Sequence, residues 1–447
     1  MTVRERLSGS ARRARGDPQT TPLRTLRSRP GALRHRAPAA LRHRDFALLW
    51  GGQSVSMLGD GVFTVVLALE ALRLDRNPAG LSFVLAARLG PAVLLLLAGG
   101  VLVDRWPRRP TMLASDAIRA AAVGVIAVSA AAGTLRLWQL AAMAALFGAA
   151  DAVFGPASTA IVPELLPADL LVQGSALNAT SQQVTRMLLG PALGGLIVAA
   201  AGYATGFAVD AVSFVVSGAC LAVMSSRPRP AQMHASALAQ AREGLRYCWS
   251  QRWLWLGIVA TGIANFAAFS PLAVLVPLLV RRDMHGSPLA VGLVLAAGGV
   301  GGAAASVTIG RTGAPRRRVS AMWLAWGAAG VAVALLGAAP DAWVAGVMQA
   351  LVWGLLMAGT VLWFPLMQEL VPPGLLGRAS SVDLIVSFVL SPLGVVVAGV
   401  AAAAWGPRPV LIGGGVVAAL SALVALLPGV RDPESADRVP GRGDLAA

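Results

Sequence analysis

The amino-acid sequence predicts an all-α membrane protein whose twelve transmembrane helices form two six-helix, pseudo-symmetric bundles. The first observation behind this prediction is composition: of the 447 residues, 56% are hydrophobic and 13% are charged. Soluble domains contain about 25% charged residues. The second observation is a succession of long apolar segments. The third is a set of short repeats between the two halves of the chain.

Twelve apolar segments are long enough to cross a membrane, because a spanning helix needs about 20 predominantly apolar residues. They divide the chain into an N-terminal bundle at 46–225 and a C-terminal bundle at 253–428. We expect the transmembrane helices at 46–72, 80–103, 111–133, 137–162, 172–200, 203–225, 253–280, 288–310, 319–339, 342–368, 376–404 and 408–428.

The two ends of the chain lie outside these bundles. Residues 1–45 are rich in Arg, Pro, Ser and Ala and have no periodic apolar pattern, which predicts a disordered basic tail in the cytoplasm. An organelle transit peptide is the alternative for this composition. Residues 429–447 are predicted to be a second cytoplasmic tail.

A basic linker at 226–252 joins the two bundles on the cytoplasmic side. In its second part, Leu245 and Trp249 share one face of a possible helix. Arg242 and Arg246 lie beside that face. This pattern predicts an amphipathic helix at the membrane surface.

Short matches between the halves occur in the same order in both. One match would mean little in a sequence so rich in Ala, Leu and Val, but several in order indicate two repeats of the same orientation. The matches are Pro78 with Pro288, Val-Leu-Ala-Ala at 84–87 and 294–297, Gly100 with Gly310, Glu164-Leu165-Leu166-Pro167 with Glu369-Leu370-Val371-Pro372, and Gly190-Pro191 with Ser391-Pro392.

The formal charge is +16, and every one of the 37 basic residues is an arginine. The arginines cluster in the N-terminal tail and in short turns between apolar segments, whereas a nucleic-acid-binding protein would spread them over a soluble domain. Arginine accumulates on the cytoplasmic side of membranes. With an even number of crossings, both termini are expected in the cytoplasm of a bacterium, with the chain spanning the inner membrane several times.

The sequence offers no support for an enzyme or a metal site. Cys220 and Cys248 have no metal-ligand spacing, and no glycine-rich loop ends in Gly-Lys-Ser or Gly-Lys-Thr. We therefore expect no cofactor. Energy is expected from an ion gradient or from the substrate's own gradient, with carboxylates as the proton carriers.

The turn between the second and third segments reads Gly100-Val101-Leu102-Val103-Asp104-Arg105-Trp106-Pro107-Arg108-Arg109. It resembles the loop between helices two and three of the major facilitator superfamily, with Pro107 in place of the usual glycine. This departure, together with Arg44-Asp45-Phe46-Ala47-Leu48-Leu49-Trp50, resembles the enterobactin-exporter and macrolide-efflux branch. The resemblance covers about residues 40–428. It implies the major facilitator fold and secondary transport of a small molecule.

The resemblance also implies roles for two groups of residues. Asp104 is expected to bond to the start of the eleventh segment, near Arg378, when the protein faces outward; a carboxylate at a helix N-terminus gains about 0.3–2 kcal/mol. Ordinary solvated charges are the alternative. The fifth segment resembles the glycine-proline motif of antiporters, which implies a helix pivot, with simple close packing as the alternative. The gate residues are Gly100, Asp104, Arg105 and Arg108, and the pivot residues are Gly190, Pro191 and Gly194.

Asp60 is the most informative charge inside an apolar segment. It lies about 14 residues into the first segment, which at ~1.5 Å per residue is near the bilayer centre. Ionisable groups at that depth usually face a cavity or a partner. Asp60 is therefore a candidate proton carrier. Arg186 is its suggested ion-pair partner, and Asp151 and Asp210 are the rival carboxylates for pairing with Arg186. A buried structural ion pair is the alternative.

Other polar residues in the apolar segments are candidates for the lining of a central cavity. Asp116 and Arg119 are expected to pair with each other, and Glu70 and Arg88 are equally well read as outer gate residues or as packing. Phe266, Phe269, Trp353 and Trp363 form either an aromatic wall or ordinary packing. The expected polar lining comprises Gln53, Asn178, Gln182, Asn265 and Asp383.

These features predict a secondary active transporter that exports an amphipathic small molecule, such as a drug, antibiotic or siderophore, in exchange for protons. Import of a nutrient and a membrane sensor or scaffold without transport are the alternatives. The expected partners are a small-molecule substrate and the lipid bilayer, without nucleic acid, and the expected state is a monomer.

Overall fold

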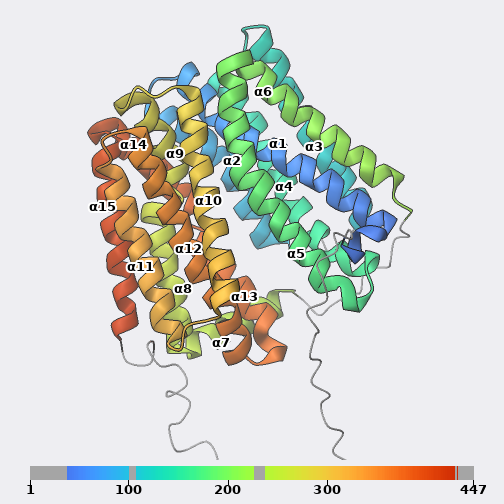
Figure 1. Cartoon of the computed structure of the whole chain (residues 1–447), viewed down its shortest axis with the longest axis vertical. Coiled ribbons are helices and arrows are strands. Elements are labelled where there is room, and N and C mark those ends of the chain that lie inside the picture. Colours follow the sequence, from blue (N-terminus) through green and yellow to red (C-terminus); the bar gives the residue numbers. More distant parts are fainter. Residues whose placement is uncertain (1–37, 100–106, 226–236, 428–429, 431–447) are drawn as a thin grey trace, which may run out of the picture. The chain divides into compact units, whose positions relative to one another are not determined.

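The computed structural model describes residues 38–99, 107–225, 237–427 and 430, and within these ranges the chain is helical, without a β-strand (Figure 1). Eleven helical stretches among these residues are long and apolar enough to cross a membrane. A helix suits this setting because it satisfies its own backbone polar groups where no water is available. The predicted class, an all-α multi-pass membrane protein, is confirmed.

The first half begins slightly earlier than the sequence indicates. A short 3-10 helix, η1 (Ala39–Arg42), lies within the predicted tail, and the backbone N–H of Ala40 donates to Gln173 Oε1 at 2.8 Å. The helices that follow are α1 (Arg44–Leu74), α2 (Pro78–Gly99), α3 (Arg108–Ala131), α4 (Leu137–Leu165), η3 (Ala168–Leu170), α5 (Leu171–Ser181), the π-helix η4 (Gln182–Leu189) and α6 (Gly190–Val223).

The stretch Ala168–Val223 is 56 residues long and is the one place where two predicted segments run together. Inside α6, Gly202 has φ 82° and ψ 177°, which no residue of a continuous helix adopts. The backbone therefore breaks at the point where the sequence predicts a turn between 200 and 203. Glycine suits this position because a positive φ strains residues that carry a Cβ atom.

The second half starts with a helix that lies within the 226–252 segment. Its elements are α7 (Ala237–Ser250), α8 (Arg252–Ala264), the π-helix η5 (Asn265–Phe269), α9 (Leu272–Leu278), the π-helix η6 (Leu279–Asp283), α10 (Pro288–Thr312), α11 (Arg318–Gly337), α12 (Ala342–Leu370), α13 (Pro373–Phe388), α14 (Ser391–Trp405), α15 (Pro407–Ser421) and the 3-10 helix η7 (Ala422–Leu426).

Capping residues fix the starts of two helices in this half. The Ser287 hydroxyl accepts a hydrogen bond from the Ala290 N–H, and Pro288 follows as the first residue of α10. The carboxylate of Asp341 accepts from two backbone N–H groups at the start of α12, both at 2.9 Å. Both arrangements satisfy backbone donors that an exposed helix end leaves free.

One contact recurs in both halves and agrees with the internal repeat. Arg108 at the start of α3 pairs with Glu164 near the end of α4. Arg318 at the start of α11 pairs with Glu369 near the end of α12, with 2.6 Å between Nη1 and Oε1. Both glutamates belong to the repeated Glu-Leu-X-Pro sequence, so equivalent positions of the two repeats make equivalent ion pairs.

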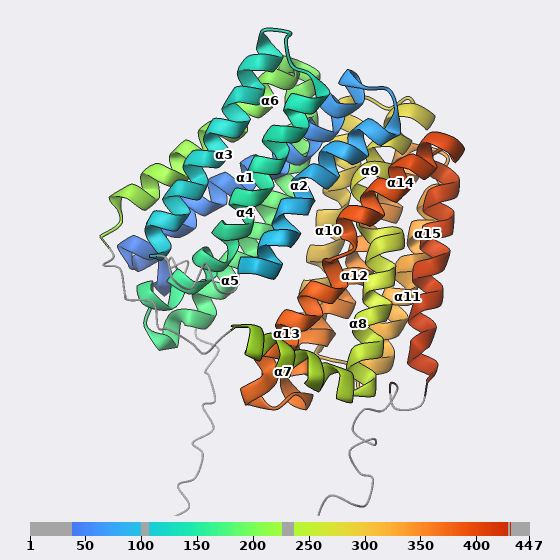
Figure 2. The same ribbon diagram turned by 180° about the vertical axis from the view of Figure 1, so that it is seen from behind.

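Helices of the two halves also touch each other, chiefly α2 with α14, which Figure 2 shows in front, and α6 with α10. These contacts are close because glycines form them. A Cβ atom on Gly399 would lie 2.4 Å from Ser82 Cβ, and one on Gly292 would lie 2.4 Å from the carbonyl oxygen of Pro191. In addition, the Gln183 side chain donates to the Gly299 carbonyl at 2.7 Å.

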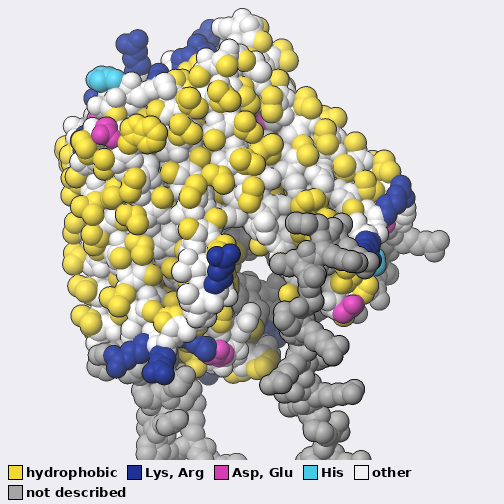
Figure 3. Space-filling model, viewed as in Figure 1, with side chains coloured by type: hydrophobic (Ala, Val, Ile, Leu, Met, Phe, Trp, Pro, Cys, Tyr) yellow, Lys and Arg dark blue, Asp and Glu magenta, His cyan; other side chains and the backbone are white. Residues whose placement is uncertain are grey.

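The outer surface of the helices is apolar. Hydrophobic side chains cover the flank of the face seen in Figure 3, and arginines gather at its lower end. Large apolar side chains remain exposed in the protein alone, including Leu324 at 73% and Val128 at 71%. An exposed apolar flank between charged ends fits a protein surrounded by lipid tails.

Candidate functional site

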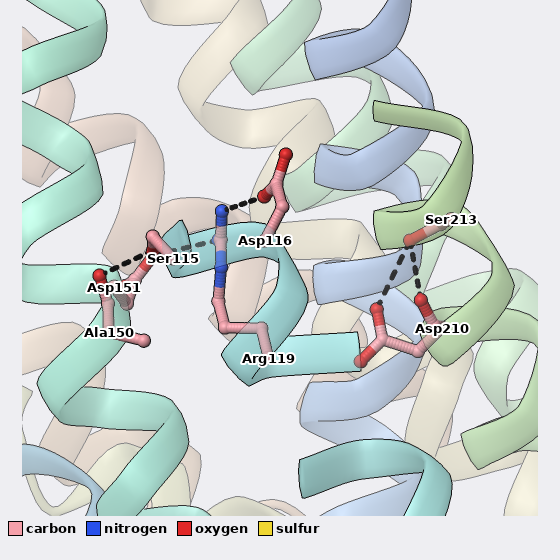
Figure 4. A network of polar contacts seen from close by, with 7 residues as sticks. All are labelled: Ser115, Asp116, Arg119, Ala150, Asp151, Asp210 and Ser213. Carbon is pink, nitrogen blue, oxygen red and sulfur yellow. Dashed lines mark hydrogen bonds and ion pairs between the residues drawn. The ribbon is translucent and has the colours of Figure 1, made fainter. Parts of the chain in front are cut away.

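The best-connected charged group inside the first half is Arg119 on α3. Its Nη2 lies 2.5 Å from Asp116 Oδ1, and its Nη1 lies 3.3 Å from Asp151 Oδ1 on α4 (Figure 4). Asp116 and Arg119 are each 1% exposed. The predicted pair is thus confirmed, and it extends to a third charged residue.

Aromatic rings enclose the same guanidinium group. The Arg119 Cζ lies 4.2 Å from the ring centre of Phe154 and 4.5 Å from that of Phe214. Ring faces attract cations most strongly where water is absent. The rings and the two carboxylates together hold this arginine in place between α3, α4 and α6.

Asp60 on α1 and Asp210 on α6 are buried without an ion-pair partner among the described residues. Asp60 is 4% exposed and Asp210 is fully buried. One carboxylate oxygen of each, Asp60 Oδ1 and Asp210 Oδ2, has no hydrogen-bond partner within the described part of the chain. The Ser213 hydroxyl donates to the Asp210 carbonyl at 2.7 Å and contacts its Oδ1 at 3.5 Å. Two carboxylates therefore lie in the interior with unused acceptor capacity.

A glycine brings these two helices together. A Cβ atom on Gly59 would lie 2.5 Å from Asp210 Oδ1 and 2.2 Å from Ser213 Oγ. Because Gly59 precedes Asp60 directly, this close approach brings the helix segment that carries Asp60 against the segment that carries Asp210.

The structure shows no ion pair between Asp60 and Arg186, so the suggested pairing stays a prediction. Arg186 lies on the π-helix η4, and its backbone carbonyl would be 2.6 Å from a Cβ atom on Gly61. The contact with α1 is thus made by the backbone of this residue, while its charge acts on Asp60 through space. π-helical turns are rare and occur often at functional sites.

A third arginine, Arg88 on α2, has an aromatic environment. Its Cζ lies 5.2 Å from the ring centre of Phe63 and 4.9 Å from that of Phe147. It does not pair with Glu70, whose carboxylate binds Arg73 at 2.7 Å instead. The positive charge of Arg88 acts electrostatically on the interior carboxylates, Asp60 and Asp210 among them.

The interior of the first half therefore contains a charge cluster, which we define as Asp60, Asp116, Asp151 and Asp210 with Arg88, Arg119 and Arg186. Arginine stays protonated in proteins. Four ionised carboxylates against three guanidinium groups leave one uncompensated negative charge. One bound proton makes the cluster neutral.

In the second half, the predicted cavity residues make hydrogen bonds. Asp383 on α13 accepts from Trp363 Nε1 at 2.9 Å and from the Ser387 hydroxyl at 3.1 Å. Asn265, in the π-helix η5, donates to the Ser387 carbonyl at 2.9 Å. These contacts connect η5 and α12 to α13.

Trp363 belongs to the packing alternative rather than to a cavity wall. It is 6% exposed, and its ring centre lies 5.9 Å from those of both Trp253 and Trp326. Of the remaining predicted lining residues, Gln53 is buried with its Nε2 unpartnered among the described residues, Asn178 is half-buried, and Gln182 is exposed.

An apolar hollow of about 410 Å³ lies between α1 and α6. It adds no charged side chain to the site. Its lining consists of Val55, Leu58, Gly59, Val62, Leu193, Ile197, Thr205, Ala208, Val209, Val212, Ser213 and Val216.

The predicted pivot residues pack directly on α1. A Cβ atom on Gly190 would lie 2.6 Å from the Cα of Gly61, and one on Gly194 would lie 2.9 Å from the Val62 carbonyl oxygen. Pro191 is the second residue of α6 and is buried. The glycine-proline motif thus forms the crossing between α6 and the helix that carries Asp60.

Most of the predicted gate lies outside the described residues, namely Gly100, Asp104 and Arg105. The fourth gate residue, Arg108, pairs with Glu164 and donates to the Ala160 carbonyl at 2.6 Å. Arg378, the suggested partner of Asp104, instead pairs with Glu243 on α7, with 2.6 Å between Nη1 and Oε2.

Comparison with known proteins decides the family. The family model of transmembrane secretion effectors, a branch of the major facilitator transporters, matches residues 36–443. The chain belongs to the major facilitator superfamily. It is 26% identical over 392 residues to the multidrug efflux pump Tap of Mycobacterium tuberculosis, covering 84% of this chain and 91% of the pump. It is 21% identical over 361 residues to macrolide efflux protein A of Streptococcus pyogenes, covering 78% of this chain and 87% of that protein.

Solved structures show the same fold. A bacterial homologue of the iron transporter ferroportin, in an inward-facing state, superposes with a TM-score of 0.67 at 16% identity, covering 86% of this chain and 98% of the homologue. A mutant of the nucleoside transporter NupG gives a TM-score of 0.70 at 12% identity, covering 86% of this chain and 99% of NupG. The superfamily and its efflux branch, predicted from the sequence motifs, are confirmed.

Proposed function

We propose that this major facilitator protein is a proton-coupled exporter of amphipathic small molecules that works by alternating access. Its setting is the inner membrane of a bacterium, with both termini in the cytoplasm and a single chain as the working unit. The efflux relatives support the direction of transport and the class of substrate. The charge cluster supports the coupling.

The observation that carries the proposal is the pair of carboxylates, Asp60 and Asp210, buried without ion-pair partners in the described structure. An ionised group in the interior of a membrane protein is expensive, so its presence indicates a function. The four carboxylates and three arginines of the cluster are one proton short of neutrality. A cationic group on a substrate supplies the same single positive charge. Substrate and proton therefore compete for the cluster, and binding of one releases the other.

Alternating access requires that one side be sealed while the other is open. The glycine contacts between α2 and α14 and between α6 and α10 support a seal on the outer side, because Ser82 and Gly292 lie early in segments that start there in the proposed topology. In this state the cluster is reached from the cytoplasm. The gate residues Gly100, Asp104 and Arg105 would then act in the opposite state.

We further propose twelve crossings in two six-helix bundles. The stretch Ala168–Val223 would be about 84 Å long as one helix, against a hydrocarbon thickness of about 30 Å. The break at Gly202 divides it into two crossings of ordinary length. The other ten stretches supply one crossing each, which gives an even total and a shared side for both termini.

The test is transport by the full chain in proteoliposomes under an imposed pH gradient, with ethidium and a macrolide as probes. The proposal predicts accumulation against the substrate gradient that depends on the pH gradient and collapses when a protonophore removes it. Uptake that follows only the substrate's own gradient would favour facilitated import. A ligand that binds and thermally stabilises the protein but is not transported would favour a sensor or scaffold.

A further inference from the structure

The linker helix α7 has one face that packs against the protein. Gly244 and Cys248 are buried on this face, and a Cβ atom on Gly244 would lie 2.9 Å from both the Cβ and the carbonyl oxygen of Arg378 on α13. Next to this contact, Glu243 pairs with Arg378 at 2.6 Å. The inner face of α7 is thus fixed to the start of α13.

The opposite face of α7 is exposed and carries basic and apolar side chains together. We define this outer face as Arg242, Leu245, Arg246 and Trp249, which follow the i, i+3, i+4, i+7 spacing of one helix face. Leu245 is 49% exposed and Trp249 is 67% exposed. Within the described part of the chain, no ion pair involves either arginine, and the acidic neighbour Glu243 is engaged by Arg378.

The position of α7 along the chain places this face at the membrane boundary. Helix α7 ends at Ser250, and the membrane-crossing stretch that contains α8 begins at Arg252. Figure 1 shows α7 running crosswise at the end of the molecule where α13 begins. At the corner between the helices, Trp249 stacks on Trp255 with ring centres 5.5 Å apart and planes 16° apart. Tryptophan is typical of the zone between lipid headgroups and tails.

We propose that the outer face of α7 binds the anionic headgroups of the adjacent bilayer leaflet. Arg242 and Arg246 bind lipid phosphates, because guanidinium groups form paired hydrogen bonds with phosphate oxygens. Leu245 and Trp249 enter the boundary between headgroups and tails, as the apolar side of an interfacial helix does. A lipid surface is favoured over a protein partner because the face lies next to a membrane span and combines aromatic and aliphatic groups with cations that have no ion-pair partner in the described structure.

The binding has a consequence for α13. Because Glu243 and Gly244 connect α7 with Arg378, lipid that fixes the outer face also fixes the start of α13 relative to the leaflet. This surface is separate from the charge cluster, so the inference does not depend on the proposed transport activity.

A nitroxide label at Leu245→Cys tests the proposal on the full chain. Cys220 is replaced by Ser, and Cys248 remains because it is 3% exposed. The protein is reconstituted in phosphatidylcholine vesicles with and without phosphatidylglycerol, and collisions of the label with oxygen and with a water-soluble nickel complex report its depth. We expect the label to lie among the lipids in vesicles that contain phosphatidylglycerol and to be more exposed to water in pure phosphatidylcholine.

Two pairs of variants separate the outer face from general basicity. Arg242→Gln with Arg246→Gln should shift the balance between membrane-bound and water-exposed label roughly fivefold for each arginine removed. Arg316→Gln with Arg317→Gln removes two exposed arginines from the turn between α10 and α11 and should leave the depth unchanged.

Three results would overturn the proposal. A label equally exposed to water in both vesicle types would show that the face does not bind lipid. Equal burial among lipids in both would show that apolar contact alone holds it and that the arginines have no part. Protection from oxygen and nickel alike would identify a protein contact, such as a second copy of the chain.

Discussion

Asp60 is either a proton-coupling residue or a structural one. The two roles predict opposite changes in stability when its charge is removed. Its carboxylate has no ion-pair partner and one unpartnered oxygen in the described structure. A buried unsatisfied charged group costs stability, by about 1–3 kcal/mol or more. A residue retained for packing would instead stabilise the fold.

We therefore predict that Asp60→Asn raises the thermal unfolding temperature, by the equivalent of about 1–3 kcal/mol, while pH-driven transport falls to the rate of empty vesicles. Asp341→Asn is the matched control, since Asn also caps helices and Asp341 lies outside the charge cluster. Calorimetry and a vesicle assay measure the two effects. Lower stability with unchanged transport would assign Asp60 to structure.

Cys248 gives a prediction about pH. Burial, assisted by the charge of Asp383, raises the pKa of the Cys248 thiol from 9.0 to about 11. The folded state thus favours the protonated thiol, so its contribution to stability is present below pH 9 and is lost as the pH rises from 9 towards 11. Maleimide, which attacks the thiolate, should leave this thiol unmodified at pH 7 in the folded protein and modify it after denaturation. Rapid labelling of the folded protein at pH 7 would contradict this.

For single residues, the sequence predicted which charged residues lie inside the protein better than it predicted what they contact. The depth of Asp60 in an apolar segment is visible in the sequence, and so is the spacing of Asp116 and Arg119. The contact of Arg119 with Asp151 depends on how α3 packs against α4, and the burial of Asp210 depends on the rotation of α6 about its axis. Neither is encoded in local spacing.

At the scale of elements, the contact between α6 and α10 at Gly292 brings backbone against backbone. A Cβ atom on Gly292 would lie 2.4 Å from the Pro191 carbonyl oxygen and 2.9 Å from the Gly195 Cα. Rigid atoms on both sides leave no room for a side chain. Overpacking of this kind costs about 1–3 kcal/mol.

Gly292→Ala should therefore shift the conformational equilibrium away from the outward-sealed state by roughly 5- to 150-fold. Spin labels at Arg76→Cys and Trp405→Cys, exposed positions near the start of α2 and at the end of α14, should move apart in electron–electron distance measurements. Gly413→Ala is the control, because a Cβ atom there has no neighbour within 4 Å. Unchanged distances in Gly292→Ala would exclude this contact as part of the seal.

Element boundaries followed from the sequence where turn residues mark them. Gly202 interrupts α6 where the apolar segments were divided, and Pro288 begins α10 as predicted. The π-helical turns at Gln182–Leu189 and Asn265–Phe269 were not predicted, because such turns are rare and the apolar pattern does not separate them from an α-helix.

For the whole molecule, the repeated Arg108–Glu164 and Arg318–Glu369 pairs support two copies of one unit with the same orientation. The apolar pattern predicted the membrane class and most of the crossings, since hydrocarbon requires long apolar helices whatever their contacts. The interior charge cluster could not be assembled from the sequence, because its residues come from separate stretches of the chain.

The proposed topology predicts which side each turn faces. A cysteine at Thr134, exposed in the turn between α3 and α4, should react with a membrane-impermeant maleimide in intact cells. A cysteine at Arg317, exposed in the turn between α10 and α11, should react only after the cells are opened. Reaction of both from the same side would rule out twelve crossings with both termini inside.

The central claim is that the charge cluster exchanges one proton for substrate. Its most direct test is the proton release measured with a pH indicator when purified protein in weakly buffered detergent binds a substrate identified by transport. The account predicts about one proton released per bound cationic substrate by the wild-type chain and none by the double variant Asp60→Asn, Asp210→Asn. Binding without proton release by the wild type, or unchanged release by the double variant, would contradict it.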